Sequence, residues 1–180
     1  MLLRLSKRII DSKDRFTLVD SFLMSCFNYC PIVWHFCNKL LTWKLEKLYE
    51  RGLRFATKDY DSDYTELLKT NDKCTFSLIR LKKIMIFVYD CVNNIHADYL
   101  NKMYKLKNNE YSMRDNMIVN VPRFNTVRFG KMSLRYSGAK LWNSVPIILK
   151  EPCNNFKEKL GKWKCENKMC TKCADFIFHE

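Results

Sequence analysis

Apolar residues in the first part of the chain recur with the period of an α-helix. In the first segment they stand at three- and four-residue spacings: Phe16, Val19, Leu23, Cys26 and Phe27. This spacing predicts a helix with one apolar face. We expect that helix to end between Asn28 and Pro31, because a residue that precedes proline is disfavoured in the α region.

A second helix is predicted to start after Pro31. Its expected apolar side consists of Leu41, Leu45, Leu48, Gly52 or Leu53, and Ala56. Its expected polar side consists of Lys44, Glu46, Lys47, Glu50 and Arg51. Like charges then stand four residues apart on the polar side, which is unfavourable in a helix. We therefore expect packing of the apolar side, and not pairing of surface charges, to stabilise this helix.

Two further helices follow a polar connector at 59–63. Asp63 with Glu66 three residues later is typical of a helix N-terminus, which predicts a short helix through Leu68. The segment from Ser77 to Asn94 is the longest apolar one and is apolar on nearly every helical face. Such a helix is expected at the centre of the core.

The pattern changes near Lys107. Polar, turn-forming residues dominate at first, and short extended or β segments are predicted around 108–130. Helical spacing returns at Ser133–Trp142, which Pro146 should end, and again at 156–163, which Asn154 should cap. The sequence therefore predicts a mainly α fold. It has one helical domain at 1–163 and a Cys-rich tail at 164–180.

Composition adds a candidate partner class to this picture only through charge. The chain has 32 Lys and Arg against 19 Asp and Glu, a formal net charge of +13. Such an excess attracts polyanions, so RNA or DNA is a candidate partner, bound without sequence specificity and in a salt-dependent way. A soluble protein with a merely basic surface is the other interpretation. With 47% hydrophobic residues, the chain is too apolar for a disordered polyanion-binding tail.

The cysteines and the hydropathy pattern indicate the cellular compartment in which the protein is expected. Nine cysteines, an odd number, in a chain of this size fit free thiols in a reducing compartment better than a disulfide framework. The residues at 1–10 do not resemble a secretory signal. The longest apolar run, near 84–89, is too short to span a bilayer. We expect an intracellular soluble protein with no membrane partner, and both nucleus and cytoplasm stay open.

Cysteines near the C-terminus form a candidate zinc site. Cys170 and Cys173 have the C-x2-C spacing that lets two thiolates reach one tetrahedral zinc, and Cys165 and His179 would complete the ligand set. The alternative is free thiols, since one C-x2-C pair with irregular outer spacing also occurs by chance. No cofactor is required by the sequence, and a structural zinc is the only candidate.

An earlier cluster, Cys26, Cys30 and Cys37 with His35, is embedded in apolar residues. For this cluster we expect packing in the core, with a metal or redox role as the alternative.

Cations alternate with aromatic residues between 114 and 142. The cations are Arg114, Arg123, Arg128, Lys131, Arg135 and Lys140. The aromatic residues are Phe124, Phe129, Tyr136 and Trp142. Cations neutralise phosphates and aromatic faces stack on bases, so this segment is the candidate nucleic-acid-binding site. The alternative is that the aromatic residues belong to the core and the cations to its solvated flank.

Several ordered motifs resemble one family. The sequence SCFNYCPIVW at 25–34 resembles the S-x-F-N-Y-C-P-L-V-W signature that follows the polymerase palm in reverse transcriptases of jockey-like non-LTR retrotransposons. LEKLYERGLR at 45–54 is similar to the family's I-x-x-L-H-E-R-A-L-R helix. Further similar segments, in the family's order, are 64–68, 111–114, 126–130, 133–142 and 145–146. The resemblance covers nearly the whole chain.

The resemblance implies the non-catalytic, thumb-like C-terminal region of an RNA-directed DNA polymerase, which helps to hold template and primer. The family's Tyr-x-Asp-Asp catalytic motif lies upstream of the matching region, and nothing before Cys26 replaces it. This chain alone is therefore expected not to be an enzyme. The chain departs from the family at Tyr49, Gly52 and Ala139, where His, Ala and Pro are usual. In the tail, Lys168 stands where the family's first Cys would fall.

Two other hypotheses stay beside nucleic-acid binding. The first is a helical protein-interaction module that self-associates through an exposed apolar face. The second is an inert relic of a decayed element with no nucleic-acid role.

Overall fold

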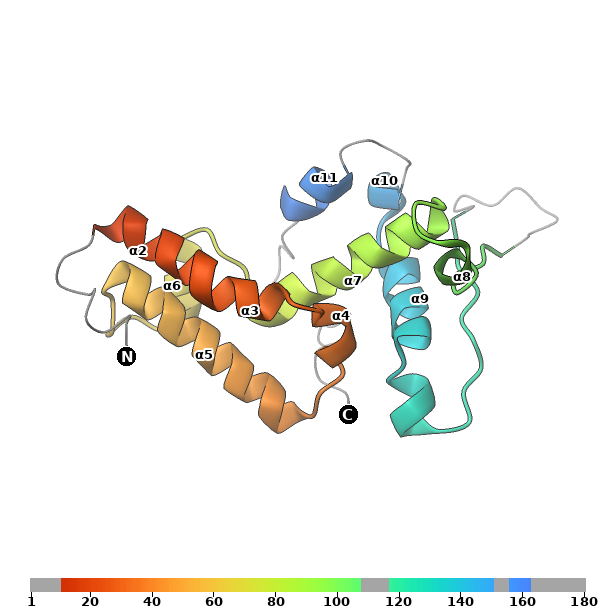
Figure 1. The fold of residues 1–180 in the computed structure, drawn as a ribbon, viewed down its shortest axis with the longest axis horizontal. Coiled ribbons are helices and arrows are strands. Elements are labelled where there is room, and N and C mark those ends of the chain that lie inside the picture. The colour runs from red at the N-terminus through yellow and green to blue at the C-terminus, as the bar shows by residue number, and fades with distance from the viewer. Residues whose placement is uncertain (1–10, 108–116, 151–155, 163–180) are drawn as a thin grey trace. The chain divides into compact units, whose positions relative to one another are not determined.

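A computed structural model describes residues 11–107, 117–150 and 156–162 of the chain (Figure 1). Helices account for most of these residues, and the described part contains no β-strand. The prediction of a mainly α fold is thus confirmed. Contacts group the chain into two compact units, Met1–Ile79 (unit 1) and Arg80–Glu180 (unit 2). The Cys-rich tail at 164–180 lies outside the described residues.

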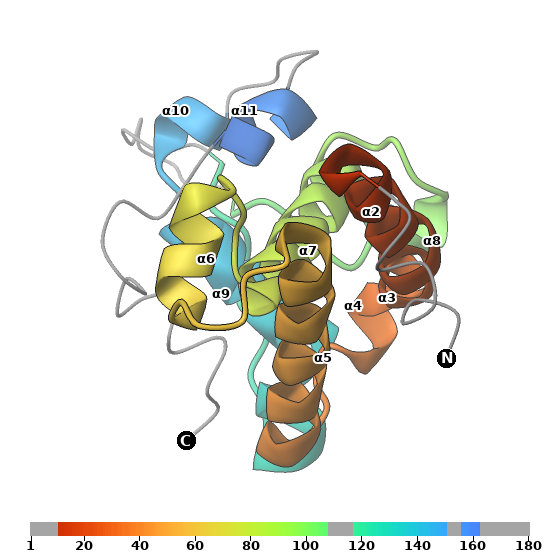
Figure 2. The same ribbon diagram turned by 90° about the vertical axis from the view of Figure 1, so that its left-hand side faces the viewer.

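Unit 1 is built around one long helix. A helical stretch runs through α2 (Ser12–Leu18), the π-helical η1 (Val19–Met24) and α3 (Ser25–Asn28). The short α4 (Pro31–Trp34) follows, then α5 (Lys39–Thr57), α6 (Tyr64–Thr70) and the first turn of α7 (Phe76–Val92). The stretch from α2 to α3 runs alongside α5 in both views (Figures 1 and 2), and α2 and η1 contact α5.

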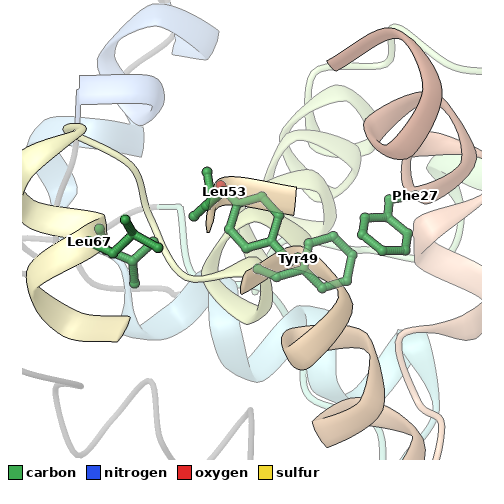
Figure 3. Close-up of a cluster of buried hydrophobic side chains, with 6 residues drawn as sticks. Phe27, Tyr49, Leu53 and Leu67 are labelled. Atoms are coloured by element: carbon green, nitrogen blue, oxygen red, sulfur yellow. The ribbon is translucent and has the colours of Figure 1, made fainter. Parts of the chain in front are cut away.

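Six buried hydrophobic residues form the core of unit 1 (Figure 3): Phe27, Tyr49, Leu53, Leu67, Leu68 and Phe76. The ring of Phe76 is central, with its centroid 4.5 Å from that of Phe27 and 5.7 Å from that of Tyr49. Burial raises the pKa of the Tyr49 hydroxyl above its ordinary value, so this side chain stays neutral. The cluster draws on α3, α5, α6 and α7, so it holds all four together.

The carboxylate of Glu46, on α5, connects three helices of unit 1 through hydrogen bonds. It accepts hydrogen bonds from the Tyr64 hydroxyl on α6 at 2.6 Å and from the backbone N–H of Phe76 at 2.9 Å. It also accepts from the backbone N–H and the hydroxyl of Ser77, at 3.1 and 3.0 Å. The N–H groups at the start of a helix have no intrahelical partner. Glu46 therefore caps α7 with a charge of the sign that a helix N-terminus favours.

The sequence-based prediction for the faces of α5 was wrong in part. Leu41 and Leu48 are exposed, whereas the buried side consists of Tyr49, Gly52, Leu53 and Ala56 with Glu50 beside them. Glu50 was predicted on the polar side, but it is buried, and its carboxylate accepts hydrogen bonds from Lys47 and Arg54. The two acids, Glu46 and Glu50, each bind partners of their own.

The Glu50 carboxyl illustrates how charge partners outweigh burial. Burial acts to raise its pKa, but the hydrogen bonds and charges of Lys47 and Arg54 are stronger together and hold the pKa of Glu50 below its ordinary value. Because the folded pKa is lowered, this contribution to stability is present above the unfolded pKa. It is lost as the pH falls through the folded value.

Helix boundaries in unit 1 follow local capping chemistry. The predicted helix after Pro31 is two helices, because Asn38 begins α5 anew by accepting a hydrogen bond from the Leu41 N–H at 2.8 Å. The predicted cap at Asp63 is confirmed, with its side chain accepting from the Thr65 N–H at 3.1 Å. At the other end of α5, the buried Arg15 donates to the Ala56 carbonyl at 3.0 Å.

Unit 2 is built around the remainder of α7. The apolar pattern of this helix predicted its central position. Its other elements are α8 (Asp98–Asn101), the π-helical η2 (Val127–Lys131), α9 (Leu134–Ser144), α10 (Ile147–Lys150) and α11 (Phe156–Lys162). The Tyr89 ring on α7 stacks on Phe156 of α11 with centroids 3.9 Å apart and planes 4° apart. Trp142 of α9 is fully buried beside both.

Side-chain hydrogen bonds attach irregular backbone to α9. The Trp142 indole donates to the Met117 carbonyl at 2.8 Å. Asn143 both accepts from the Val119 N–H and donates to its carbonyl, each at 2.9 Å. The Tyr104 hydroxyl donates to the Leu134 carbonyl at 2.8 Å. The bonds to Met117 and Val119 satisfy backbone groups of a segment that forms no helix.

The predicted extended segments are only partly extended. Leu106 and Val119 form an isolated antiparallel bridge, and 117–126 runs without helix. From Val127 on, however, the chain turns into η2, where the N–H groups of Gly130 and Lys131 both donate to the Thr126 carbonyl. Residues 108–116 and the predicted cap Asn154 lie outside the described part.

Four of the described helices are followed by left-handed backbone at a residue other than glycine. Among the described residues, φ is positive at Cys30, Lys58, Asp72 and Asn94, which follow α3, α5, α6 and α7. An L-residue pays a steric cost in this region, because its Cβ approaches the following carbonyl.

Candidate nucleic-acid interface

The candidate interface is an open depression of about 320 Å³ in unit 2. The chain before η2, η2 itself and the first turn of α9 line it, through residues that include Arg123, Phe124, Phe129, Arg135 and Tyr136. All five belong to the segment in which the sequence alternates cations with aromatic residues. The structure therefore brings residues twelve positions apart, Arg123 and Arg135, to one feature of the surface.

The bend that creates this depression depends on a close approach. A Cβ atom on Gly130 would lie 2.5 Å from the Cβ of Phe124, closer than real side chains come. Only glycine therefore lets η2 pass so near Phe124. A π-helical turn of this kind recurs at functional sites in proteins. Sequence reasoning missed this role, because nothing in the residue pattern around Gly130 indicates that its backbone passes close to Phe124.

Ser133 fixes the start of α9 at the edge of the depression. Its hydroxyl accepts from the Tyr136 N–H at 3.3 Å and donates to the Gly130 carbonyl at 2.7 Å. One turn later, the Ser137 hydroxyl donates to the Lys131 carbonyl at 3.0 Å. The positive end of the α9 dipole is thus held against η2, where it adds to the positive charge of the arginines.

The predicted cations occupy different positions in this region. Arg123 and Arg135 are exposed and line the depression, whereas Lys131 is half-buried in η2. Lys140 is exposed and places its Nζ 5.9 Å from the centroid of the Tyr136 ring. Arg128 belongs to η2, and Arg114 lies outside the described residues.

The predicted aromatic residues divide between surface and core. Phe124 and Tyr136 meet edge to face, with centroids 4.8 Å apart and planes at 75°. Phe129 also lines the depression and is 79% exposed. Trp142, in contrast, is fully buried in the core of unit 2. The interpretation as core therefore holds for Trp142, and nucleic-acid binding by the exposed residues stays a prediction.

A second depression, of about 400 Å³, was not anticipated from the sequence. Asp98, Lys102 and Lys105 line it, so its charges are mixed, together with the thiol of Cys91. Burial raises the pKa of that thiol to about 11, which keeps it protonated at neutral pH. A protonated thiol is a poor nucleophile and a poor metal ligand, so the geometry favours no chemistry there.

The predicted zinc ligands Cys165, Cys170, Cys173 and His179 all lie outside the described residues, so the zinc site stays a prediction. Within the described part, no group of three or more His, Cys, Asp or Glu could hold a metal ion.

The prediction that the earlier cysteine cluster packs in the core was wrong for two of its members. Cys26 and Cys30 are exposed and Cys37 is half-buried, whereas His35 is buried. The reason is the rotation of α3, which turns Phe27 inward and leaves Cys26 outside. Cys30 then stands in left-handed backbone beyond the helix end.

Comparison of the chain with models of protein families, with curated proteins and with solved structures finds no match. Among the described helices, none combines the length and the apolar character that crossing a membrane requires.

Proposed function

We propose that this chain binds nucleic acid as the non-catalytic C-terminal region of a non-LTR retrotransposon reverse transcriptase. The observation that carries the binding proposal is the joint placement of Arg123 and Arg135 in one aromatic-lined depression at the start of α9. The family assignment is supported by the ordered sequence motifs from 25 to 146. In this proposal the chain helps to hold template and primer, and the polymerising carboxylates belong to the region upstream.

Phosphate binding follows from the chemistry of the two arginines. A guanidinium presents N–H donors in a planar fork that matches two phosphate oxygens, and it stays charged at any physiological pH. Each phosphate that the protein neutralises releases condensed counterions, so the affinity falls as salt rises. The exposure of both side chains leaves them accessible to a polynucleotide backbone.

The test is a fluorescence polarisation titration of the full chain with a labelled oligonucleotide over a range of salt concentrations. For the double variant Arg123→Ala/Arg135→Ala, we expect weaker binding at every salt concentration. The slope of log affinity against log salt should decrease by roughly 0.7 per lost phosphate contact on a single strand. The charge-matched control is Lys44→Ala/Arg51→Ala, which removes two exposed cations of α5.

Two results would count against the proposal. One is an absence of binding by the wild-type chain even at about 50 mM salt, where phosphate contacts are strong. The other is equal weakening by this double variant and by Lys44→Ala/Arg51→Ala, which removes the same charge. That result would assign binding to net charge and not to the depression.

A second candidate function is docking of another protein on the outer face of α5. Leu40, Trp43 and Leu48 are all exposed there, with Trp43 at 58%. Lys44 and Arg51 are exposed on the same side of the helix, where residues three and four apart are neighbours. Exposed apolar side chains on one helix face favour a protein contact.

Self-association through this face is tested by light scattering of the wild-type chain. A concentration-dependent increase in mass, abolished by Trp43→Ser, would support it, and a monomer at all concentrations would exclude it. Failure of this test leaves the nucleic-acid proposal untouched, because the two surfaces share no residue.

A further inference from the structure

We infer that the depression at η2 selects unpaired nucleotides, so that single strands bind more tightly than duplexes of the same sequence. This inference rests on the proposed nucleic-acid function and names the form of nucleic acid that the site accepts. The juxtaposition that carries it is one highly exposed aromatic ring, Phe129, within the same depression as Arg123 and Arg135.

The aromatic residues of the depression differ in exposure. Phe124 and Tyr136 engage each other edge to face, and the Lys140 ammonium lies near the Tyr136 ring. Phe124 is 39% exposed, whereas Phe129 of η2 is 79% exposed. A base that stacks on this ring covers apolar surface that otherwise faces water.

Phe129 can recognise only one part of a nucleotide. Its side chain has no hydrogen-bonding group, so it cannot read the base edges that a duplex presents in its grooves. It can contact the face of a base. In a duplex these faces are covered by the neighbouring base pairs, whereas in a single strand they are accessible to aromatic side chains.

A duplex could reach the ring only by extruding a base. Extrusion costs at least as much free energy as one stacking contact returns, so the protein would gain nothing from it. Phosphates, in contrast, are available to Arg123 and Arg135 in both forms. We therefore expect the arginines to contribute to the binding of single strands and duplexes alike, and Phe129 to the binding of single strands alone.

The volume of the depression agrees with this division of roles. At about 320 Å³ it is near the lower limit of ligand-binding pockets in proteins. A space of this size suits one nucleotide unit with its phosphate beside the arginines, and it is too small to receive a duplex.

The experiment compares three labelled probes of equal length with the full chain at low salt. They are an oligothymidylate, the duplex that it forms with oligoadenylate, and a single strand that carries phosphates and sugars but no bases. For Phe129→Ala we expect roughly five- to 100-fold weaker binding of the oligothymidylate, the range of one base–aromatic stack. Binding of the duplex and of the abasic strand should change by less than about twofold.

Two further variants separate stacking from other effects. Phe129→Leu keeps apolar bulk without a ring face and should behave like Phe129→Ala, whereas Phe129→Tyr keeps the ring and should bind like the wild type. Tyr99→Ala removes an aromatic side chain that is 71% exposed on α8, outside the depression, and should change no affinity. Circular dichroism checks that each variant folds, which the exposure of both positions favours.

Each outcome decides between the two proposals. Equal affinity of the wild type for single strand and duplex, with Arg123→Ala/Arg135→Ala still weakening both, overturns the single-strand inference and leaves the proposed function intact. Equal loss of the oligothymidylate and of the abasic strand in Phe129→Ala overturns it as well, because stacking needs a base. No binding of any probe by the wild type refutes the proposed function and this inference together.

Discussion

The two units of this protein are both helical, but different contacts hold their segments in place. In unit 1, a cluster of apolar side chains joins four helices, and one carboxylate, that of Glu46, links α5 to α6 and α7. In unit 2, single polar side chains of α9 hold irregular backbone, through Trp142 on Met117 and Asn143 on Val119. Regular segments can thus be joined by apolar burial, whereas irregular ones need a hydrogen-bond partner for each backbone group.

The largest effect is expected at Trp142, where burial and backbone attachment coincide. Trp142→Ala should lower the free energy of unfolding by about 3–5 kcal/mol, because it leaves a cavity and removes the donor to the Met117 carbonyl. Urea denaturation measures this loss. Hydrogen exchange should locate it in α9 and at 117–121, with α5 of unit 1 largely protected.

Trp142→Phe sharpens this test, because it removes the N–H donor and keeps an aromatic ring with most of the apolar volume. We expect a smaller loss, about 1–3 kcal/mol, for the unpaired carbonyl. If α5 lost protection as strongly as α9 in either variant, the two units would unfold as one, and the contrast between them would be wrong.

A smaller effect is expected where unit 1 depends on a polar contact. Glu46→Ala removes the acceptor of the Tyr64 hydroxyl and of the Phe76 and Ser77 N–H groups. It should destabilise the protein by about 1.5–3 kcal/mol, the range of hydrogen bonds to a charged group. Thermal denaturation followed by circular dichroism measures the change.

Asp61→Ala provides the matched control for Glu46→Ala, because Asp61 is an exposed acid in the connector between α5 and α6. Its loss should stay within about 0.5 kcal/mol. Equal losses in both variants would show that the Glu46 contacts contribute no net stability.

The last two effects are expected at two glycines and have opposite signs. A Cβ on Gly138 of α9 would collide with the Tyr104 hydroxyl, which is buried and hydrogen-bonded to the Leu134 carbonyl. Gly138→Ala should therefore cost about 1–3 kcal/mol. A Cβ on Gly52 of α5 would lie 2.6 Å from the Cδ2 atom at the end of the Leu23 side chain, which can rotate away.

Gly52→Ala should consequently be neutral or stabilise the protein by up to about 1 kcal/mol, the usual gain from alanine within a helix. Urea midpoints of the two variants, measured side by side, give the comparison. A loss at Gly52 as large as that at Gly138 would mean that the packing of α5 against η1 is as rigid as that around Tyr104.

Periodicity predicted much of unit 1 but not its polar contacts. The helices around α5, α6 and α7 and the cap at Asp63 follow from apolar spacing and capping residues. The buried face of α5 was predicted wrongly, because the helix offers two sets of residues with helical spacing. One set is Leu41, Leu45 and Leu48, and the other is Tyr49, Gly52, Leu53 and Ala56. The core selects the second set. No local pattern indicates that Glu46 binds groups thirty residues away.

For the candidate site, the sequence indicated the residues but not their arrangement. The alternation of Arg123, Phe124, Phe129, Arg135 and Tyr136 was visible, whereas the bend that unites them depends on Gly130 approaching Phe124. The sequence also could not separate Trp142 from the surface aromatic residues. That separation depends on which side of α9 packs against α7, a property of tertiary structure alone.

The left-handed residues at the helix ends also have a practical consequence. The backbone has a positive φ at Cys30, Lys58 and Asp72. Glycine adopts this conformation without steric cost, whereas other residues are strained in it. Lys58 is exposed and directly follows the C-terminal end of α5. Its replacement by glycine relieves this strain. The position is far in sequence from the depression and from the Trp142 contacts. Lys58→Gly should therefore raise the stability of the protein without changing the depression in unit 2.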